Sequence, residues 1–573
     1  MTDNKEQDTE IHPLKSEEGA SPASPAKKGV CLGGSRLFHL SSWRTAAFFV
    51  SLFLCLTIVF AFSFIIPCPV RPVSQRTWIN TYRDSSTYTF LAVTDANNDK
   101  VMDVIFALRG SNGSLNASCS NKGFSPCSFL VAVTGTNGSV LWKRSLSQEL
   151  LWVQCGIEKL GGLEAAGCLV FNSQHLTAID SRSGVTLWEN NNTLELKQLA
   201  VKVPDLDGDE VGDVALIGAA ENKTKVVIVS GKTGQQIGTD ADPGLSDVSG
   251  HVIHVTSSGS YYILFKKGKD CHSCCTCVTC FCLLELYSPF FLFVADSAVY
   301  GYALKNIVAM AIKTPGSNIK LQQDPKWEEM TNSTSGSVSV YNSGSVQHLL
   351  KMGIQGKTPE NLLLVTGHWV ELIDGQSLSS LWRVNITKVI SEPVFGNFNN
   401  DGVPDVVVED EIGNGTKKVV ILDGSSGAVL WEVEMMSSST SPKPSTVNTT
   451  DYRSAFLFWG EVRGKTNTTV SLNQQDFLYL LHPSYPKILL ELNNSTENIA
   501  AFKVVLFEKS RHACYVLLTG PTEQSETGSV SLSKRKLKED VALSRVVRLS
   551  QEEGFSDQEV RDSFLKLRYS SSA

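Results

Sequence analysis

Residues 205–217 read DLDGDEVGDVALI, and this stretch decides how the rest of the chain is interpreted. Asp205, Asp207, Asp209 and Asp213 place carboxylates at the first, third, fifth and ninth positions of a loop, with a glycine between the second and the third. Carboxylates this close repel one another unless a cation lies among them, and Ca²⁺ takes about six to eight oxygens from such flexible loops. The apolar run that follows is typical of a β-strand. We therefore predict a calcium loop that leads into a strand.

The same spacing occurs twice more, each time before a short apolar run. The two weaker copies comprise Asp95, Asn97, Asp99 and Asp103, and Asn397, Asn399, Asp401 and Asp405. An EF-hand is excluded, because its loop needs a bidentate Glu at the twelfth position and an exiting helix. Here that position is Phe106, Leu216 or Val408. The alternative is a set of surface turns rich in Asp, Asn and Gly, but three loops that each precede a strand favour a repeated architecture.

A second motif consists of a glycine turn followed by a short run that ends in Trp. The clearest copies are GTNGSVLW (135–142), DSRSGVTLW (180–188) and DGSSGAVLW (423–431), and weaker ones are SGKTG (230–234) and DGQSLSSLW (374–382). This pattern predicts a tight turn and then a strand whose Trp packs into the core. Successive copies lie about 46 to 50 residues apart, and such a period is typical of four-stranded propeller blades.

The two motifs keep a constant phase along the chain. Asp205 follows the turn at Asp180 by 25 residues, and Asn397 follows the turn at Asp374 by 23 residues. A shared phase is harder to obtain by chance than either motif alone. We predict an all-β fold, a β-propeller of about seven or eight blades over residues 77–532, with a pair of β-sandwiches as the alternative. Residues 533–573 are expected to add a strand, a short helix and a tail.

The N-terminal region predicts a membrane anchor. Residues 1–45 are polar and rich in Ser, Pro, Glu and Lys, which is typical of a disordered tail. Residues 46–66 carry no charge and are long enough to cross a bilayer as one helix, and 67–76 form a linker. More basic residues precede than follow this segment, so the tail is expected in the cytosol. The predicted topology is single-pass type II, with the propeller extracellular or lumenal, at the cell surface or in the secretory pathway.

Glycosylation sequons support this topology, because all of them follow the uncharged segment. They are centred on Asn112, Asn116, Asn137, Asn191, Asn222, Asn332, Asn385, Asn414, Asn448, Asn467, Asn493 and Asn494. A net charge of −7 and the lack of a basic stripe exclude nucleic acid as an expected partner.

Cysteine spacing predicts two local disulfides and one unusual segment. Cys119 and Cys127, and Cys155 and Cys168, are close enough in sequence to form disulfides. Residues 270–307 contain a dense cysteine cluster and interrupt the repeat, and we interpret them as an insertion in a loop. A zinc site is the alternative for the cluster, although its overlapping Cys-x-x-Cys pairs differ from the separated pairs of a zinc finger. Membrane re-entry is a weaker alternative, because the apolar run is short and contains a Glu and a Pro.

The chain resembles a known family. Its Asp-rich loops are similar to the FG-GAP repeats of integrin alpha-subunit propellers. The order of tail, span and propeller resembles the integrin-alpha FG-GAP repeat-containing membrane proteins, the family with sequence similarity 234. The stretches that carry this resemblance are DYRSAFLFWG (451–460), EKSRHA (508–513), LLTGP (517–521) and SRVVRL (544–549). It implies a type II glycoprotein with a β-propeller ectodomain, structural calcium loops and no catalytic role. Residues 270–307 depart from the family pattern.

These observations predict a protein-binding or scaffold module with structural Ca²⁺ rather than an enzyme. Its partner would be a protein ligand or another membrane protein. One alternative is an accessory subunit of such a membrane protein. A second alternative is a quinoprotein-like propeller enzyme, because the turn and Leu-Trp signature resembles the blades of such dehydrogenases. No nucleophile elbow, phosphate loop or His-Glu-x-x-His motif is present in the sequence.

Overall fold

The computed structural model describes residues 42–65, 77–110, 127–146, 148–173, 175–191, 194–220, 223–268, 298–312, 321–354, 356–436, 441–462, 476–495, 498–508, 512–522, 527–550 and 554–570. The chain divides into two compact units, Met1–Arg71 and Pro72–Ala573, which are described separately. Of the first unit, the structure describes α1 (Ser42–Ile65), a helix of 24 residues. Among the residues described, no helix has both the length and the apolar character that a membrane crossing requires.

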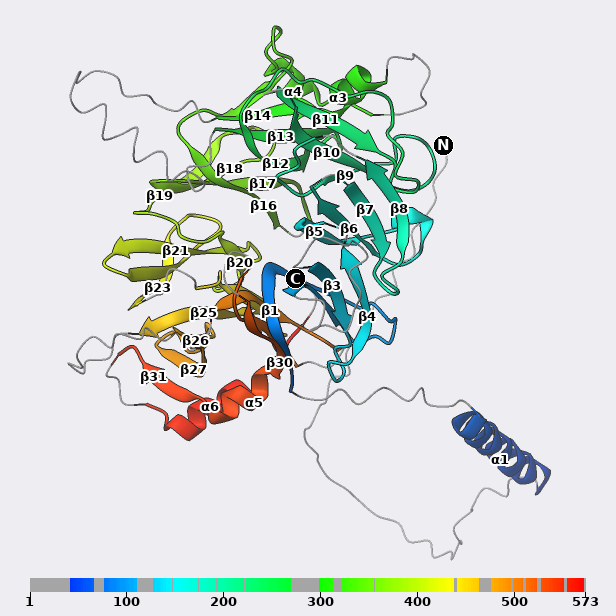
Figure 1. Ribbon diagram of the computed structural model, residues 1–573. Coiled ribbons are helices and arrows are strands. Elements are labelled where there is room, and N and C mark those ends of the chain that lie inside the picture. Colours follow the sequence, from blue (N-terminus) through cyan, green and yellow to red (C-terminus); the bar gives the residue numbers. More distant parts are fainter. Residues whose placement is uncertain are drawn as a thin grey trace, which may run out of the picture. The chain divides into compact units, whose positions relative to one another are not determined.

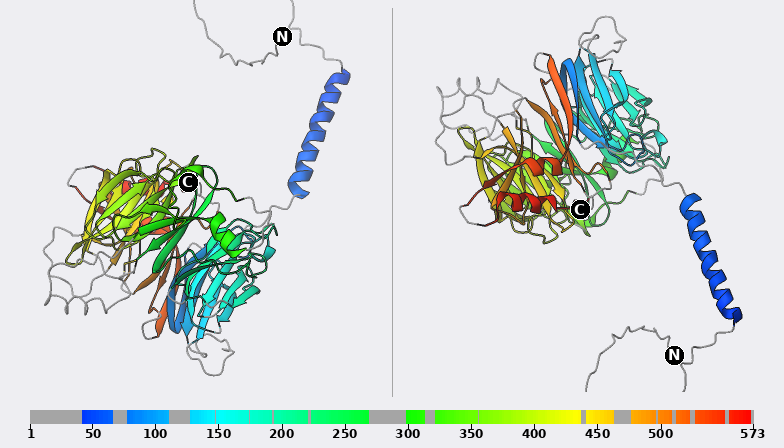
Figure 2. Two further views of the ribbon diagram at one scale, coloured as in Figure 1. Left: turned by 90° about the horizontal axis from the view of Figure 1, so that it is seen from above. Right: turned by 90° about the horizontal axis from the view of Figure 1, so that it is seen from below.

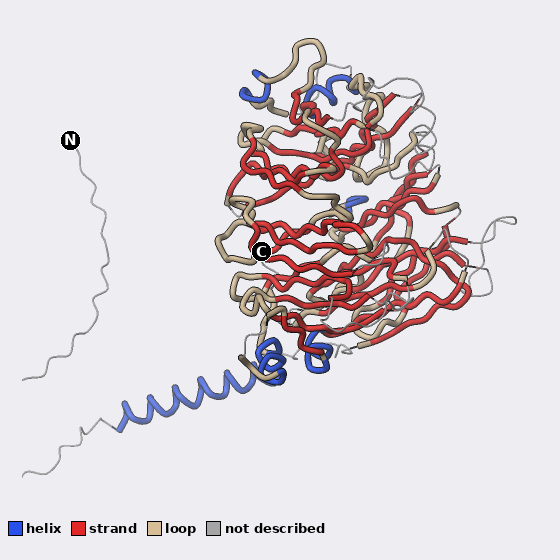
Figure 3. The backbone as a smooth tube through the Cα atoms, turned by 90° about the vertical axis from the view of Figure 1, so that its left-hand side faces the viewer, coloured by secondary structure: helices blue, strands red, loops and turns tan. Residues whose placement is uncertain are grey.

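The second unit is built mainly from antiparallel β-strands, seen as red tube in Figure 3. The first sheet has the strand order β28-β29-β30-β1-β2-β3-β4. Its members are β1 (Trp78–Thr94), β2 (Asp103–Gly110), β3 (Cys127–Val133), β4 (Val140–Leu146), β28 (Ile499–Val505), β29 (Cys514–Thr519) and β30 (Gly528–Lys536). The next sheet contains β5 (Leu150–Ile157), β6 (Gly167–Asn172), β7 (His175–Asp180) and β8 (Thr186–Asn191), with the 3-10 turn η1 (Leu160–Gly162).

Three further sheets follow in chain order. They contain β9 (Val201–Val203), β10 (Asp213–Ala220) and β11 (Lys223–Val229); β12 (Val248–Val255), β13 (Tyr261–Lys267), β14 (Ala298–Ala303) and β15 (Val338–Tyr341); and β16 (Val346–Ile354), β17 (Lys357–Thr366), β18 (Trp369–Ile373) and β19 (Ser380–Asn385).

The last sheet joins two strand groups through a short pairing of β23 with β25. The first group is β20 (Val394–Gly396), β21 (Asp405–Gly413), β22 (Thr416–Leu422) and β23 (Val429–Met436), and the second is β24 (Ser445–Asn448), β25 (Ser454–Val462), β26 (Asp476–Leu481), β27 (Ile488–Ser495) and β31 (Arg545–Arg548). The helices of this unit are α3 (Leu304–Ala311), α4 (Pro325–Glu329), α5 (Leu537–Leu543) and α6 (Asp557–Leu565).

The sheets follow one another around a common centre in chain order (Figure 1). First strands of neighbouring groups contact each other: β1 contacts β5, β9 contacts β12, β12 contacts β16, β20 contacts β24, and β28 contacts both β24 and β1. The long strand β1 closes the ring, because Trp78 to Tyr82 pair with β30 from the C-terminal part while Leu91 to Thr94 pair with β2. The N-terminal and C-terminal parts of the unit are thereby joined by main-chain hydrogen bonds.

Hydrophobic clusters fill the spaces between consecutive strand groups. In one cluster, Ile105 and Leu130 of the first group meet Val153 and Cys168 of the second. Within the described residues there are eight such clusters, and the one that contains Val516 also contains β1–β3 residues, so the series closes on itself. Burial therefore stabilises the contacts between sheets all the way around.

The structure assigns the end of the predicted insertion and the C-terminal region differently from the sequence. Residues 298–307 were assigned to the insertion, but 298–303 form β14, which pairs with β13 and β15, and α3 begins at Leu304. Their apolar side chains are buried between sheets, whereas residues 271–297 lie outside the described part. Strand β30 continues through the expected boundary at 532/533.

The C-terminal region contains two helices, α5 and α6, which lie side by side (Figure 2, right). The expected short helix is confirmed as α6, which begins with a capping box formed by Ser556 and Glu559, and its Val560 and Phe564 are buried.

Candidate functional site

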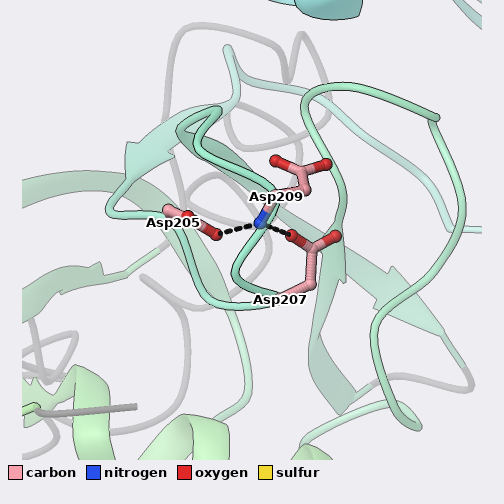
Figure 4. A group of neighbouring side chains, drawn as sticks. All are labelled: Asp205, Asp207 and Asp209. Atoms are coloured by element: carbon pink, nitrogen blue, oxygen red, sulfur yellow. Dashed lines mark hydrogen bonds between the residues drawn. The ribbon is translucent and has the colours of Figure 1, made fainter. Parts of the chain in front are cut away.

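The strongest predicted loop connects β9 to β10 and brings three carboxylates together (Figure 4). Single oxygens of Asp205, Asp207 and Asp209 lie within 4.8 Å of one another. The loop holds them in place by main-chain donors: the amide of Asp209 donates to both Asp205 and Asp207, at 3.2 Å each. Burial raises the pKa of Asp205, but hydrogen bonds from Glu210, Gly208 and Asp209 outweigh it, and its net pKa is lowered. Main-chain donors thus hold the three side chains close together.

Asp213, the ninth residue of this loop, has a different role from the other three. Its side chain is 1% exposed, and its two oxygens accept the main-chain N–H groups of Leu206 at 2.7 Å and Gly231 at 3.1 Å. The carbonyl of Gly231 in turn accepts the indole N–H of Trp188 at 3.1 Å. Asp213 therefore ties its own loop to the glycine turn of the same strand group, and through that turn to the preceding group.

The same chain of hydrogen bonds recurs in both weaker copies. Asp405 accepts the N–H groups of Phe398 at 2.6 Å and Gly424 at 3.0 Å, and Trp382 donates to the Gly424 carbonyl at 2.9 Å. Near the closure of the ring, the corresponding residues are Asp103, Gly135 and Trp78. The constant spacing between the two sequence motifs thus reflects a direct hydrogen bond between the ninth-position aspartate and the turn glycine.

Close packing requires glycine at the second position of the turns that contain Gly231 and Gly424. A Cβ atom added to Gly231 would lie 2.0 Å from the carbonyl oxygen of Gly212, and one on Gly424 would lie 2.0 Å from that of Pro404. Such distances lie far inside any van der Waals contact. A larger residue would separate the turn from the carboxylate that braces it.

The Trp residues connect each strand group to the next one. Trp142 of β4 donates its indole N–H to the Ser181 carbonyl in the turn after β7, at 2.9 Å. Its ring lies against Gly184, where an added Cβ would be 2.7 Å away. Trp188 and Gly234 repeat this arrangement one group later. The prediction that each Trp packs into the core is therefore refined: each one docks on the turn of the following group, which accounts for the repeat length.

The weaker loops use amide groups where the strong loop has carboxylates. The Asn97 side chain donates to Asp99 at 3.0 Å, and the Asn399 side chain donates to Asp401 at 3.2 Å. These contacts relieve the carboxylate repulsion that would otherwise require a cation. Within the described residues, the 205–209 group is the one place where ligand atoms of three His, Cys, Asp or Glu side chains lie within 4.8 Å of one another.

Burial shifts the ninth-position carboxyls toward the protonated form. It raises the pKa of Asp213 to about 6, against the opposing hydrogen bonds from Leu206 and Gly231, and raises the pKa of Asp405 to about 6 for the same reason. The pKa of Asp103 is also raised by burial. These side chains are buried in order to brace the fold.

The fit of Ca²⁺ to the strong loop can be judged from its donors. Oxygen-only ligands from three carboxylates match the preference of this ion. Both oxygens of Asp213, however, already accept main-chain hydrogen bonds. The Lys232 ammonium lies 3.2 Å from the Asp209 carbonyl oxygen, so a protein cation is also close to the cluster. The residues that fit the ion are therefore Asp205, Asp207 and Asp209.

The predicted modification sites are placed as follows. Exposed sequon side chains are Asn137, Asn191, Asn332, Asn385 and Asn414. Partly buried ones are Asn448 and Asn493, while Asn112, Asn116, Asn222, Asn467 and the side chain of Asn494 lie outside the described part. The disulfide between Cys155 and Cys168 is confirmed, and it joins directly paired residues of β5 and β6. Cys127 is also disulfide-bonded, and Cys119, its expected partner, is outside the described residues.

Sequence reasoning missed Trp78 and the bracing role of Asp213. The signal for Trp78 was weak, because it precedes its turn partner Gly135 by 57 residues and belongs to the strand that closes the ring. The sequence feature that could have indicated the role of Asp213 is Gly231, which lies 18 residues later in the next turn and whose N–H donates to Asp213.

A closed ring of antiparallel sheets, several of which dock on the next through a buried Trp such as Trp142, Trp188 or Trp382, defines a β-propeller. Comparison with known proteins agrees: the family model described as "FAM234A/B beta-propeller" matches residues 78–280 and 279–570. The chain belongs to the FAM234 family. It is 38% identical to Protein FAM234A of Homo sapiens over the whole of both chains, and 30% identical to Protein FAM234B of Gallus gallus over 86% of this chain and 77% of that protein. A solved Dos1 propeller shares 11% identity, with a TM-score of 0.42, over 80% of this chain and 95% of that one.

Proposed function

We propose that this propeller is a protein-binding or scaffold module held at a membrane, and that it is not an enzyme. The observation that carries the proposal is that the residues most marked in the sequence brace the fold. The tryptophans, turn glycines and ninth-position aspartates bond to one another. This use of the motifs produces a rigid ring whose connecting loops are free to serve as contact surface, as in other scaffolds.

The pairing pattern favours eight blades. Seven groups begin at β1, β5, β9, β12, β16, β20 and β24, and the eighth consists of β28, β29, β30 and the first half of β1. The eight hydrophobic clusters among the described residues correspond to eight blade interfaces. We infer an eight-bladed propeller closed by its N-terminal strand.

Membrane attachment and type II topology rest on the sequence. Residues 46–66 carry no charge, and every sequon lies after them. Five sequon side chains are exposed in the structure, as glycosylation requires. Glycosidase treatment of the protein made in mammalian cells should increase its gel mobility, whereas unchanged mobility would contradict a lumenal or extracellular propeller.

Calcium would be a structural component of the second loop. Bound Ca²⁺ would supply positive charge among Asp205, Asp207 and Asp209, and its binding energy would add to folding stability. At a concentration about 100 times its Kd it should stabilise the protein by roughly 2.7 kcal/mol. The melting temperature should rise with Ca²⁺, and Asp207→Asn should abolish the rise. The matched change Asp99→Asn should leave it intact. A wild-type melting temperature that is identical in Ca²⁺ and in chelator would refute the structural ion.

The binding function can be tested in cells by proximity labelling. The full-length chain, fused at its C-terminus to a labelling peroxidase, should enrich specific proteins over a control with residues 1–76 joined to an unrelated folded domain. Crosslinking should then recover the same proteins. Enrichment that is identical for the two fusions would refute a propeller-dependent binding function.

A further inference from the structure

The turn between β24 and β25 presents an exposed aromatic side chain from a main chain whose conformation is held by hydrogen bonds. Tyr452 is 79% exposed and has a φ of 62°, which is unusual for a bulky residue. The turn is closed by hydrogen bonds from the Thr449 amide to the Arg453 carbonyl at 2.7 Å and from the Tyr452 amide to the Thr449 carbonyl at 3.2 Å. Strained backbone of this kind persists where the surroundings hold it, and such sites are often functional.

The C-terminal segment supports this turn from one side. The Thr450 amide donates to the Arg568 carbonyl at 2.8 Å, and the Ser570 amide donates to the Asn448 carbonyl at 2.9 Å. These bonds place exposed Arg568 beside the turn. Both the turn and its basic neighbour are therefore fixed by main-chain contacts.

Two lysines are gathered on the adjoining elements. Lys536 ends β30, where it pairs with Cys514, and Lys538 follows in α5, whose first amide donates to the Ala513 carbonyl at 3.0 Å. Neither lysine forms an ion pair within the described residues, and the Arg568 guanidinium donates to main-chain carbonyls of Lys566 and Leu567. We call Lys536, Lys538 and Arg568 the cation cluster.

The three cations act on a common neighbour. The pKa of His512 is lowered first by burial and then by Lys538, Lys536 and Arg568. The pKa of Lys538 is lowered by burial and by the other two. The nearby acids are Glu508, Glu539 and Asp451, which precedes Tyr452 in the turn. Glu539 accepts the Thr77 hydroxyl at 2.9 Å, and Asp451 accepts the Thr449 hydroxyl. Among these described residues, the three cations form no ion pair with the acids.

We propose that the Tyr452 turn and the cation cluster form one docking surface for an acidic segment of a partner protein. The inference rests on the proposed protein-binding function and specifies its surface. Cations that form no ion pair complement carboxylates and steer association, while an exposed Tyr is a typical hot spot because its side chain has few rotatable bonds to order on binding. A polyanion such as a sulfated sugar or a lipid headgroup would use the cations but would not need the aromatic ring.

The sequon at Asn448 is compatible with this surface. Its side chain is partly buried, and its oxygen accepts the Ser454 hydroxyl at 2.7 Å. A glycan at this position would cover the turn. Mass spectrometry of the mammalian protein should find Asn448 unoccupied, and a glycan there in most molecules would overturn the proposal.

Binding is tested with the full-length chain and labelled peptides. The probes are oligoglutamate and the same peptide with two central leucines. Reversal of the cluster by Lys536→Glu, Lys538→Glu and Arg568→Glu should weaken both peptides by at least roughly tenfold. The control Arg182→Glu, Lys197→Glu and Lys305→Glu changes the charge equally at exposed sites that form no ion pair within the described part of the chain, and it should change binding by less than roughly twofold.

The aromatic contribution is tested separately. Tyr452→Gly removes the ring and relieves the strained backbone, so it should weaken the leucine peptide several-fold more than oligoglutamate. Tyr452→Phe should retain most of the leucine-peptide binding. Equal effects of cluster and control reversals, or tighter binding of heparin fragments or phosphatidylserine vesicles than of either peptide, would overturn the proposal. If these variants also leave the proximity-labelled proteins unchanged, binding occurs elsewhere and the proposed function stands; if the wild type labels no specific protein, the proposed function itself fails.

Discussion

The docking of Trp382 on the turn at Gly427 can be measured with a matched pair of glycine substitutions. Gly427 and Gly402 have nearly the same backbone conformation, with φ of 73° and 83°. A Cβ added at Gly427 would lie 2.9 Å from the Trp382 ring, whereas nothing lies within 4 Å of a Cβ at Gly402. The two Ala substitutions therefore share the backbone strain and differ in the contact with the ring.

The magnitudes follow from these two differences. Left-handed backbone destabilises a non-glycine residue by about 1 to 2 kcal/mol, which sets the expected effect of Gly402→Ala. Forcing a methyl group into the Trp382 contact should add about 1 to 3 kcal/mol to this destabilisation, because Trp382 is only 7% exposed and its ring cannot move away freely. Gly427→Ala should therefore lower the free energy of unfolding by about 2 kcal/mol more than Gly402→Ala does.

Urea unfolding of the full-length chain provides the assay. The midpoint should fall further for Gly427→Ala, and an unchanged slope would show that the difference reflects stability. In a Trp382→Leu background the smaller side chain leaves room, so Gly427→Ala should have nearly the effect of Gly402→Ala. Equal effects of the two substitutions in the wild-type background would refute the claim that the Trp contact selects glycine in this turn.

Three further predictions concern buried groups. Lys417 and Glu409 form a fully buried ion pair at 2.6 Å, so Lys417→Met alone should leave an unpaired buried charge and destabilise the protein by about 3 to 5 kcal/mol. The double variant Lys417→Met with Glu409→Leu should unfold near the wild-type urea midpoint. Equal losses of stability in the single and double variants would contradict this. Burial lowers the pKa of His482 to about 4, so below about pH 6.5 the unfolded chain binds a proton that the folded chain does not. The contribution of His482 to stability should therefore fall by roughly 2 kcal/mol between neutral pH and pH 5, while the raised pKa values of Asp213 and Asp405 act in the opposite direction. His482→Gln should reduce that pH dependence, and an unchanged dependence would show that another group causes it. The disulfide between Cys155 and Cys168 joins residues 13 apart in sequence, and its reduction should destabilise the chain by about 3 kcal/mol. The double variant Cys155→Ser with Cys168→Ser should be destabilised equally, and a urea midpoint equal to that of the wild type would contradict this.

The hydrogen bonds of His482 add to the effect of burial and also favour its neutral state. Its Nδ1 accepts the Ser484 amide at 3.3 Å, and its Nε2 lies 3.3 Å from the Thr449 hydroxyl. Protonation would place a hydrogen on Nδ1 and replace the first contact with a repulsion between two donors. This histidine is 0% exposed and packs on Phe564, so it is a packing residue of the core.

Much of the fold could be predicted because its determinants are local. The carboxylate spacing at Asp205 specifies a loop before a strand, and the turn glycines and Trp residues repeat with the length of one blade. The family resemblance to FAM234 proteins is likewise confirmed by the family-model match and by relatives of equal length. Local patterns survive because each blade repeats the same packing problem.

The direction of individual side chains could not be predicted in this way. Whether Asp213 faces a cation or the main chain depends on how β10 is aligned with the turn at Gly231, which belongs to a later strand connection. The strand at 298–303 was concealed by the cysteine-rich composition before it, although its pairing with β13 is regular. The left-handed conformation of Tyr452 could not be predicted, because neighbours from the C-terminal segment hold the turn through main-chain hydrogen bonds.

Strand direction explains why the marked residues gather at one end of the ring. In an antiparallel four-stranded blade, the connection between the first and second strands and that between the third and fourth leave at the same end. The carboxylate loops are connections of the first kind, and the Trp-docked turns are of the second, so each pair can bond within a blade. The Tyr452 turn lies between β24 and β25, and Lys536 ends β30, the third strand of its blade. By this rule both lie at the same end as the carboxylate loops. The docking surface would thus be supported by the turns that the Trp and Asp residues make rigid. The opposite end of the ring holds three exposed sequons: Asn191 and Asn385 at the ends of fourth strands, and Asn414 between a second and a third strand.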